Sequence, residues 1–172
     1  MNEVINNILT RRSVRSFSDT PISKADMETL IKAGLYAPSG MGRQTWKFTG
    51  ILNASIIAEL ADTISKVLDR QNYNFYNAKS LILISNAKDS AWGRDDNACA
   101  LQNIMLAANS MEIGSVWINQ LKGICDHEEI RPILTKLGIP ANHEIYGLAA
   151  LGYSTNPPAG IVDKIGEFVI ID

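Results

Sequence analysis

Two short segments of the chain carry the side chains with the clearest chemistry. The first is Arg11-Arg12-Ser13-Val14-Arg15, in which three guanidinium groups and a hydroxyl fall within five residues. Arg presents a rigid fork of N–H donors that suits phosphate or a planar anionic acceptor, and crowded guanidinium groups repel one another unless an anion is bound. The segment therefore predicts an anion-binding site, although an isolated Arg-Arg pair is more often a solvated surface cluster.

The second segment runs from Ala37 to Phe48 and has the opposite character. A Pro and a Gly that end a helix are combined there with small polar residues, before a Trp opens the next element. Such residues let backbone amides approach a flat ligand closely. Pro and Gly also form ordinary turns in all kinds of proteins, so this segment points to a site only because it follows the arginine segment.

Together the two segments resemble the nitroreductase family of FMN-dependent oxidoreductases. The shared pattern is an Arg-Arg-Ser-x-Arg element, then a helix, then Ala-Pro-Ser-Gly, then a Gln two residues before a Trp; here these are 11–15, 37–40, Gln44 and Trp46. A weaker resemblance continues over nearly the whole chain, through 81–85, 98–108 and 114–118. This chain departs from the commonest family pattern at two positions: Gly42 stands where Asn is frequent, and Thr45 stands where Pro is frequent.

The resemblance implies two groups of flavin contacts. The first group contacts the FMN phosphate, the ribityl chain and the pyrimidine edge: Arg11, Arg12, Ser13 and Arg15. Arg15 is the candidate for the positive charge near N1 and O2, which stabilises the reduced flavin and raises its reduction potential. The second group reaches the ring of a flavin bound mainly by the other subunit: Pro38, Ser39, Gly40 and Met41, with Gln44 in support.

The resemblance also assigns several residues more weakly. Asn72 lies in a polar loop where many members place an amide or a basic residue near the flavin. Trp117 and Asn119 lie where a strand of the family ends near flavin N5, so that a backbone N–H or the Asn119 amide would donate there; Trp117 as an ordinary core residue is an equal alternative. Lys164 is the one late basic residue that could match a family contact to the phosphate, with a solvated side chain as the alternative.

The elements that must position these residues follow from hydrophobic periodicity. Helical spacing predicts helices over 4–9, 27–35, 56–68 and 98–108, whereas strands are expected over 47–52, 81–84, 115–118 and 145–153. The continuous apolar run at 81–84 indicates a strand that is covered on both faces. Polar loops are expected at 71–77 and 89–96, and Pro132 favours a short or broken element that ends at Gly138.

This alternation predicts one domain over residues 1–172, with helices packed on a central sheet. The resemblance refines it to an α+β fold with a mixed, mainly antiparallel sheet, in an intertwined homodimer whose C-terminal strand completes the partner's sheet. The sequence itself shows a spacer with two adjacent prolines at 154–160 and then an apolar run at 168–171. That run is too apolar to be left in water, a pattern compatible with exchange between subunits.

Composition excludes several classes of function. With a net charge of −2 over 172 residues, the chain has no general attraction to nucleic acid or to an anionic membrane. No apolar run long enough for a membrane span and no signal peptide are apparent, so we expect a cytoplasmic protein. Cys99, Cys125, His127 and His143 show no spacing typical of a disulfide framework or a metal site.

The sequence therefore leads to an FMN-dependent NAD(P)H oxidoreductase. The resemblance implies ping-pong transfer of hydride from NAD(P)H through FMN to a small acceptor such as a nitroaromatic or a quinone. We expect no catalytic side chain, because the flavin carries the hydride. No Gly-x-Gly-x-x-Gly segment follows a strand, so the sequence predicts no separate Rossmann domain for the nicotinamide. This agrees with a mechanism in which both substrates bind in turn over the same face of the flavin. The alternatives are a flavin-binding carrier or sensor with little turnover, and an anion-binding module for nucleic acid, which the acidic charge disfavours.

Overall fold

A computed structural model describes residues 2–171 of the protein. Its helices are α1 (Glu3–Thr10), α2 (Lys24–Leu35), α3 (Ala54–Val67), α4 (Gly93–Ser110) and α5 (Arg131–Lys136). Its strands are β1 (Trp46–Ile51), β2 (Ser80–Ala87), β3 (Gly114–Ile118) and β4 (His143–Gly152), and short 3₁₀ turns occur at Gly40–Gly42 and Phe75–Asn77. The helices and strands expected from periodicity all form, with ends shifted by a few residues.

The four strands form one sheet in the order β1-β2-β4-β3. All three neighbouring pairs are antiparallel. Parallel pairing within residues 2–171 is limited to a single bridge between Ser13 and Ser115, so the expected mixed sheet is antiparallel except at this point. Strand β3 consequently forms one edge of the sheet, and the arginine segment lies beside it.

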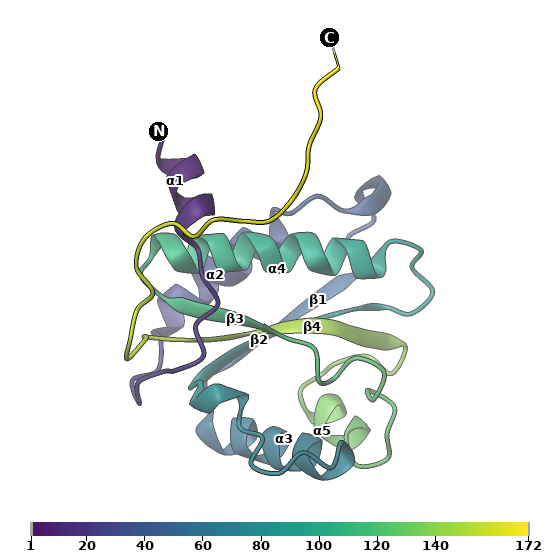
Figure 1. The fold of residues 1–172 in the computed structure, drawn as a ribbon. Coiled ribbons are helices and arrows are strands. Elements are labelled where there is room, and N and C mark those ends of the chain that lie inside the picture. The colour runs from purple at the N-terminus through teal and green to yellow at the C-terminus, as the bar shows by residue number, and fades with distance from the viewer. Residues whose placement is uncertain (1, 172) are drawn as a thin grey trace.

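Helices cover both faces of the sheet, which confirms the predicted α+β architecture. Figure 1 shows α2 and α4 on one face, α3 and α5 on the other, and α1 outside α4. Strand β2 lies in the centre and is buried along its whole length, as its continuous apolar run predicts. Leu81 and Leu83 pack toward α3, whereas Ile82 and Ile84 pack toward α4, because successive side chains of a strand point to opposite faces.

Helix α4 begins earlier than the sequence indicates. Residues 93–96, expected within a polar loop, form its first turn. Asp95 and Asp96 lie in that turn, where negative charge is favourable because the backbone N–H groups of a helix start are unpaired. The prediction of a loop up to Asp96 was therefore wrong, because polar residues at a helix start resemble those of a loop.

Helix α1 and the C-terminal segment leave apolar side chains in solvent. On α1 these are Val4, Ile5, Ile8 and Leu9, each at least 40% exposed. The helix is held to α4 by asparagine amides, since Asn7 Nδ2 donates to the Leu106 carbonyl at 2.9 Å and Asn109 Nδ2 donates to Asn7 Oδ1 at 2.6 Å. Packing of an apolar stripe therefore plays little part in holding α1 within this chain.

Residues 155–171 have no regular secondary structure and run away from the sheet (Figure 1). Residues 168–171, expected to join a sheet edge, pair with no strand of the described part of their own chain, and their apolar side chains are 77–89% exposed. Exchange of this segment between subunits stays a prediction. Across residues 2–171, none of the helices has the length and apolar character needed to cross a membrane.

Candidate functional site

The arginine segment crosses the end of the sheet at which β3 begins and β4 ends. Val14 N donates to the Ser115 carbonyl at 2.9 Å, and Ser18 N donates to the Tyr153 carbonyl at 2.8 Å. Val14 is buried whereas Ser13 and Arg15 are exposed, because alternate residues of an extended chain point to opposite sides. The backbone pairing therefore directs Ser13 and Arg15 outward beside the edge strand β3.

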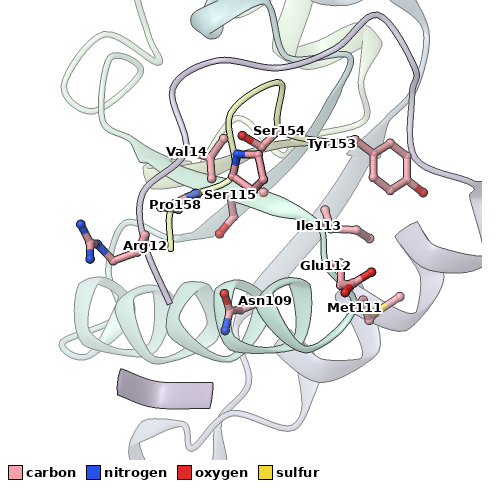
Figure 2. A pocket seen from close by; sticks show the side chains of 12 residues that line it. Arg12, Val14, Asn109, Met111, Glu112, Ile113, Ser115, Tyr153, Ser154 and Pro158 are labelled. Carbon is pink, nitrogen blue, oxygen red and sulfur yellow. The ribbon is translucent and has the colours of Figure 1, made fainter. Parts of the chain in front are cut away.

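Arg12 has a buried guanidinium nitrogen without a partner. Its Nη1 is shielded from solvent and makes no hydrogen bond within residues 2–171. The side chain lines a cavity of about 510 Å³ together with Asn109, Glu112 and Ser115, and Figure 2 shows Arg12 and Glu112 on opposite sides of it. A buried donor left unpaired costs about 1–3 kcal/mol or more when charged, so an anionic acceptor for Arg12 would be stabilising.

Arg15 lies next to the loop that carries Asn72. Its Cζ is 6.0 Å from the ring centroid of Tyr76, a distance at which a cation is attracted to the ring face. Tyr76 and Asn72 line a second cavity, of about 290 Å³, together with Gln120, which follows β3. The structure thus brings Arg15 and Asn72 to the same margin of β3 and adds Gln120, whose amide gave no signal in the sequence beyond its place after the strand.

The loop partner of Gln120 is Tyr73. The phenol oxygen of Tyr73 lies 3.5 Å from Gln120 Oε1, and burial raises the pKa of this phenol well above its usual range. The phenol therefore stays protonated and acts as the donor to the amide oxygen. Gln120 Oε1 also accepts from Asn119 N at 3.2 Å, which links the loop around Asn72 to the end of β3.

Trp117 and Asn119 are joined to each other at the same edge. Trp117 Nε1 donates to Asn119 Oδ1 at 2.6 Å. The indole packs so closely on Gly147 that a Cβ there would overlap it, with Leu101 of α4 beside the same glycine. Trp117 therefore packs in the core next to α4 and also orients the exposed Asn119 amide. A contact of either residue with the flavin stays a prediction.

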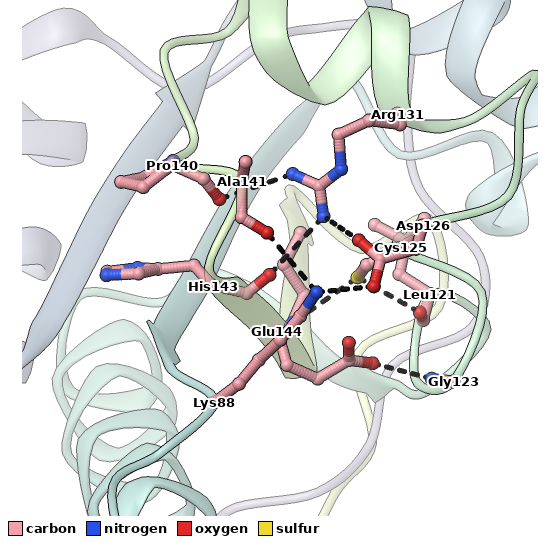
Figure 3. Close-up of polar contacts among 11 residues, drawn as sticks. Lys88, Leu121, Gly123, Cys125, Asp126, Arg131, Pro140, Ala141, His143 and Glu144 are labelled. Atoms are coloured by element: carbon pink, nitrogen blue, oxygen red, sulfur yellow. Dashed lines mark hydrogen bonds and ion pairs between the residues drawn. The ribbon is translucent and has the colours of Figure 1, made fainter.

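A polar network fixes the loop that follows Gln120 (Figure 3). Arg131 Nη2 donates to Asp126 Oδ1 at 3.0 Å and to the His143 carbonyl at 3.3 Å, and Lys88 Nζ also donates to Asp126. The bond from Lys88 lowers the pKa of Asp126. The loop around Asp126 and the start of α5 are therefore held to the start of β4.

Cys125 lies buried within this loop. Its Sγ accepts from Ile145 N and donates to the Leu121 carbonyl, each at 3.3 Å. Burial raises the pKa of the thiol to about 12, so the group stays protonated and unreactive at neutral pH. Within the described range of 2–171, no group of three or more His, Cys, Asp or Glu side chains could hold a metal ion.

The glycine-containing bend after α2 is organised by a carboxylate that sequence reasoning missed. Ser39 Oγ donates to Asp96 Oδ2 at 2.9 Å, and Gly40 N donates to Asp96 Oδ1 at 2.8 Å. Ser39 Oγ also accepts from Gln44 N at 2.9 Å. Met41 projects from this bend, 77% exposed. Ser39, Gly40 and Gln44 therefore have hydrogen-bond partners within their own chain, whereas the exposed Met41 side chain is open to a ligand.

Thr45, which stands where the family frequently has Pro, anchors the other end of the bend. Its Oγ1 donates to Asn86 Oδ1 at 2.6 Å. The buried Asn86 amide also donates from Nδ2 to the Gly93 carbonyl at 3.3 Å. The bend is thereby connected to the end of β2 and the start of α4, and the threonine hydroxyl provides a link that a proline could not make.

The two groups of expected contacts lie at opposite ends of α4. Arg12 shares its cavity with Asn109, whereas Ser39 and Gly40 bind Asp96, thirteen residues earlier in the helix. At 1.5 Å of rise per residue, these helix positions are about 20 Å apart. One chain therefore does not bring the arginine segment and the bend into one cavity, and Trp117 lies between them near the middle of α4.

Known proteins similar to this chain share both its sequence pattern and its fold. The Nitroreductase family profile matches residues 8–73 and 65–153. A protein of Archaeoglobus fulgidus, provisionally named an NADH dehydrogenase/NAD(P)H nitroreductase, is 33% identical over 160 residues, which cover 89% of this chain and 86% of that protein. The NADPH-flavin oxidoreductase of Vibrio harveyi is 26% identical over 171 residues, which cover 92% of this chain and 68% of that protein.

Solved structures agree with the sequence relatives. A nitroreductase of Bacteroides fragilis with bound FMN superposes with a TM-score of 0.92 at 37% identity, and the match covers 100% of both chains. A nitroreductase of Desulfitobacterium hafniense, also with bound FMN, gives a TM-score of 0.86 at 20% identity over the whole of both chains. The second likeness concerns the fold alone.

Proposed function

The chain belongs to the nitroreductase family, and from this premise we propose that it is an FMN-dependent NAD(P)H oxidoreductase. The proposal depends chiefly on one observation, the buried Arg12 Nη1 that has no acceptor in the described chain. Two further cationic or hydroxyl donors, Ser13 and Arg15, are directed outward from the same extended segment. The similar Bacteroides fragilis nitroreductase binds FMN, a ligand whose phosphate and pyrimidine groups need such donors.

The residues at the edge of β3 fit FMN in their chemistry. Arg11 and Arg12 would bind the phosphate, since guanidinium and phosphate form charge-assisted hydrogen bonds. Ser13 would serve the ribityl chain, and Arg15 would lie at the pyrimidine edge, where its charge stabilises negative charge and raises the reduction potential. Asn72 and Asn119 would supply amide hydrogen bonds to the ring.

Bound FMN would supply the redox chemistry, accepting a hydride from NAD(P)H and passing reducing equivalents to a second substrate. The side chains of this protein bind and orient the reactants, and none of them is assigned a proton transfer. Both substrates would occupy one open face of the site in turn, which gives ping-pong kinetics. A nitroaromatic or a quinone is the class of acceptor that we propose.

We further propose that the site is completed in a homodimer. The bend at 38–44 and the arginine segment are separated along α4 within one chain, so a flavin that touches both needs the bend of a second copy. The exposed apolar side chains of α1 and of residues 168–171 support such pairing, because apolar surface of this kind is stabilised by burial against another chain. Exchange of the C-terminal segment between the two subunits would cover the apolar side chains of residues 168–171.

Spectroscopy of the purified protein tests this proposal directly. We expect a yellow protein with flavin absorption that bleaches anaerobically on addition of NADH or NADPH and regains its colour when a quinone or a nitroaromatic is added. Colour that bleaches with no reoxidation across a panel of acceptors would favour a flavin carrier or sensor. A colourless protein that fails to bind added FMN would refute the assignment.

A further inference from the structure

The start of α4 contains a buried carboxylate. Asp96 is 4% exposed, and the ion pairs among residues 2–171 do not include it. A buried carboxylate is costly unless it is hydrogen-bonded. Its partners here are the Ser39 hydroxyl at 2.9 Å and the Gly40 amide at 2.8 Å, so Asp96 is bound entirely to the bend.

These two hydrogen bonds close the bend into a fixed shape. The Ser39 hydroxyl that donates to Asp96 accepts from Gln44 N on its other side. Between these anchors, Met41 and Gln44 adopt left-handed backbone conformations with φ of 53° and 49°. Side-chain-bearing residues hold such conformations only when the surrounding structure fixes them, and Asp96 provides that constraint.

A second contact restricts the bend from the side. Gly40 packs against the Trp92 indole so closely that a Cβ would overlap the ring. The guanidinium of Arg43 lies over the same ring, with Cζ 5.4 Å from its centroid. Trp92 and Asp96 are only four residues apart on the chain, so the start of α4 acts as a rigid support for the bend from Ser39 to Gln44.

We propose that Asp96 is a positioning residue for the cofactor site, holding the Ser39–Gly40 bend in the orientation in which its backbone and Met41 contact the flavin ring. The inference rests on the proposed function and adds to it a residue that touches no ligand itself. Because the start of α4 is a rigid support, loss of the Asp96 bonds should change the geometry of the contacts to the flavin ring while the overall fold is kept.

Asp96→Asn tests this inference with the smallest change of shape. An amide can accept from Gly40 N through Oδ1, but its NH₂ group then faces Ser39, whose hydroxyl loses its acceptor. The matched control is Asp95→Asn, since Asp95 lies in the same helix turn and is exposed. Both variants remove one negative charge from the start of α4, and only the first removes the bond that Asp96 accepts from the Ser39 hydroxyl.

Three measurements are compared between the variants. Hydrogen exchange of the apoprotein should show faster exchange at Gly40 and Gln44 in Asp96→Asn and no change in Asp95→Asn. The FMN dissociation constant of Asp96→Asn should rise about tenfold, the effect of losing one hydrogen bond to a charged group. The visible circular dichroism of the bound flavin should change as well, because it reports on the asymmetry around the ring.

Ser39→Ala provides a second test if Asp96→Asn is too unstable to purify. It removes the bond from Ser39 Oγ to Asp96 Oδ2, while Gly40 N still donates to Asp96 Oδ1, and it also removes the acceptor of Gln44 N. It should therefore give the same changes in exchange and dichroism. A lower melting temperature with unaltered FMN affinity, dichroism and exchange would overturn the positioning role. Wild-type and Asp95→Asn proteins that both fail to bind FMN would instead refute the proposed function itself.

Discussion

Subunit complementation is the sharpest test of the shared site. The perturbation consists of one substitution in each of the two segments: Arg12→Ala, which removes the guanidinium that has a buried unpaired nitrogen, and Gly40→Ala, whose Cβ would overlap Trp92. If the two segments of one chain formed a site together, a dimer with one defect in each chain would have no intact site. If a site combines the segments of two chains, that heterodimer has one intact site.

The expected magnitude follows from the separation of the segments. Asp96 and Asn109 mark the two segments and lie about 20 Å apart along α4, so each site should take its arginines from one chain and its bend from the other. Each variant homodimer should bind FMN about 10- to 100-fold more weakly, as expected for loss of a charged hydrogen bond or displacement of the bend. The heterodimer should retain about half of the sites at wild-type affinity.

The assay uses two affinity tags on co-expressed chains, so that tandem purification yields the heterodimer alone. FMN binding is titrated by quenching of flavin fluorescence, and NAD(P)H oxidation is measured on the same samples. A matched control pairs Arg12→Ala with Arg15→Ala, which affects the same half of both sites and should restore nothing. A heterodimer of Arg12→Ala and Gly40→Ala that binds no FMN at wild-type affinity, although it is folded and dimeric, would refute the reasoning.

Three other perturbations follow from the structure. Because burial raises the pKa of the Cys125 thiol to about 12, iodoacetamide at pH 8 should modify Cys125 only after unfolding; rapid alkylation in the native protein, seen by mass spectrometry, would contradict this. Burial lowers the pKa of His143, so its contribution to stability is present above the unfolded pKa of about 6.5 and is lost as pH falls. His143→Gln should therefore flatten the dependence of the melting temperature on pH between about 7 and 5. An unaltered slope would show that His143 is not responsible for this dependence. Deletion of residues 168–172 should dissociate the dimer or cause aggregation in size-exclusion chromatography, because apolar surface loses its cover; an unchanged dimer would exclude strand exchange.

Much of the fold could be predicted because local patterns report burial. The run Leu81–Ile84 has no polar residue, and only a strand between two helical layers can bury both of its faces; the structure places β2 there. The start of α4 was missed because Asp95 and Asp96 read as loop residues, although Asp96 is buried through bonds to the distant Ser39. Such a bond joins segments 57 residues apart and leaves no local signal.

The candidate site likewise contains residues that could be predicted from the sequence and residues that could not. The donors of Arg11, Arg12, Ser13 and Arg15 could be predicted from their types and spacing, since a dense set of guanidinium groups indicates an anion regardless of the fold. The partners that orient the bend, Asp96 and Trp92, and the link from Thr45 to Asn86 were not predicted. Each of them comes from another element, and packing alone determines which elements meet.

By itself the sequence determined the order of helices and strands and the chemistry that the arginine segment can recognise, because both depend on neighbours in the chain. Only the tertiary structure decided that β3 is an edge strand with this segment beside it, and that the bend lies at the opposite end of α4. The physical reason is that an 18-residue helix is rigid and about 27 Å long, and it separates segments that adjoin its two ends however close they are in sequence.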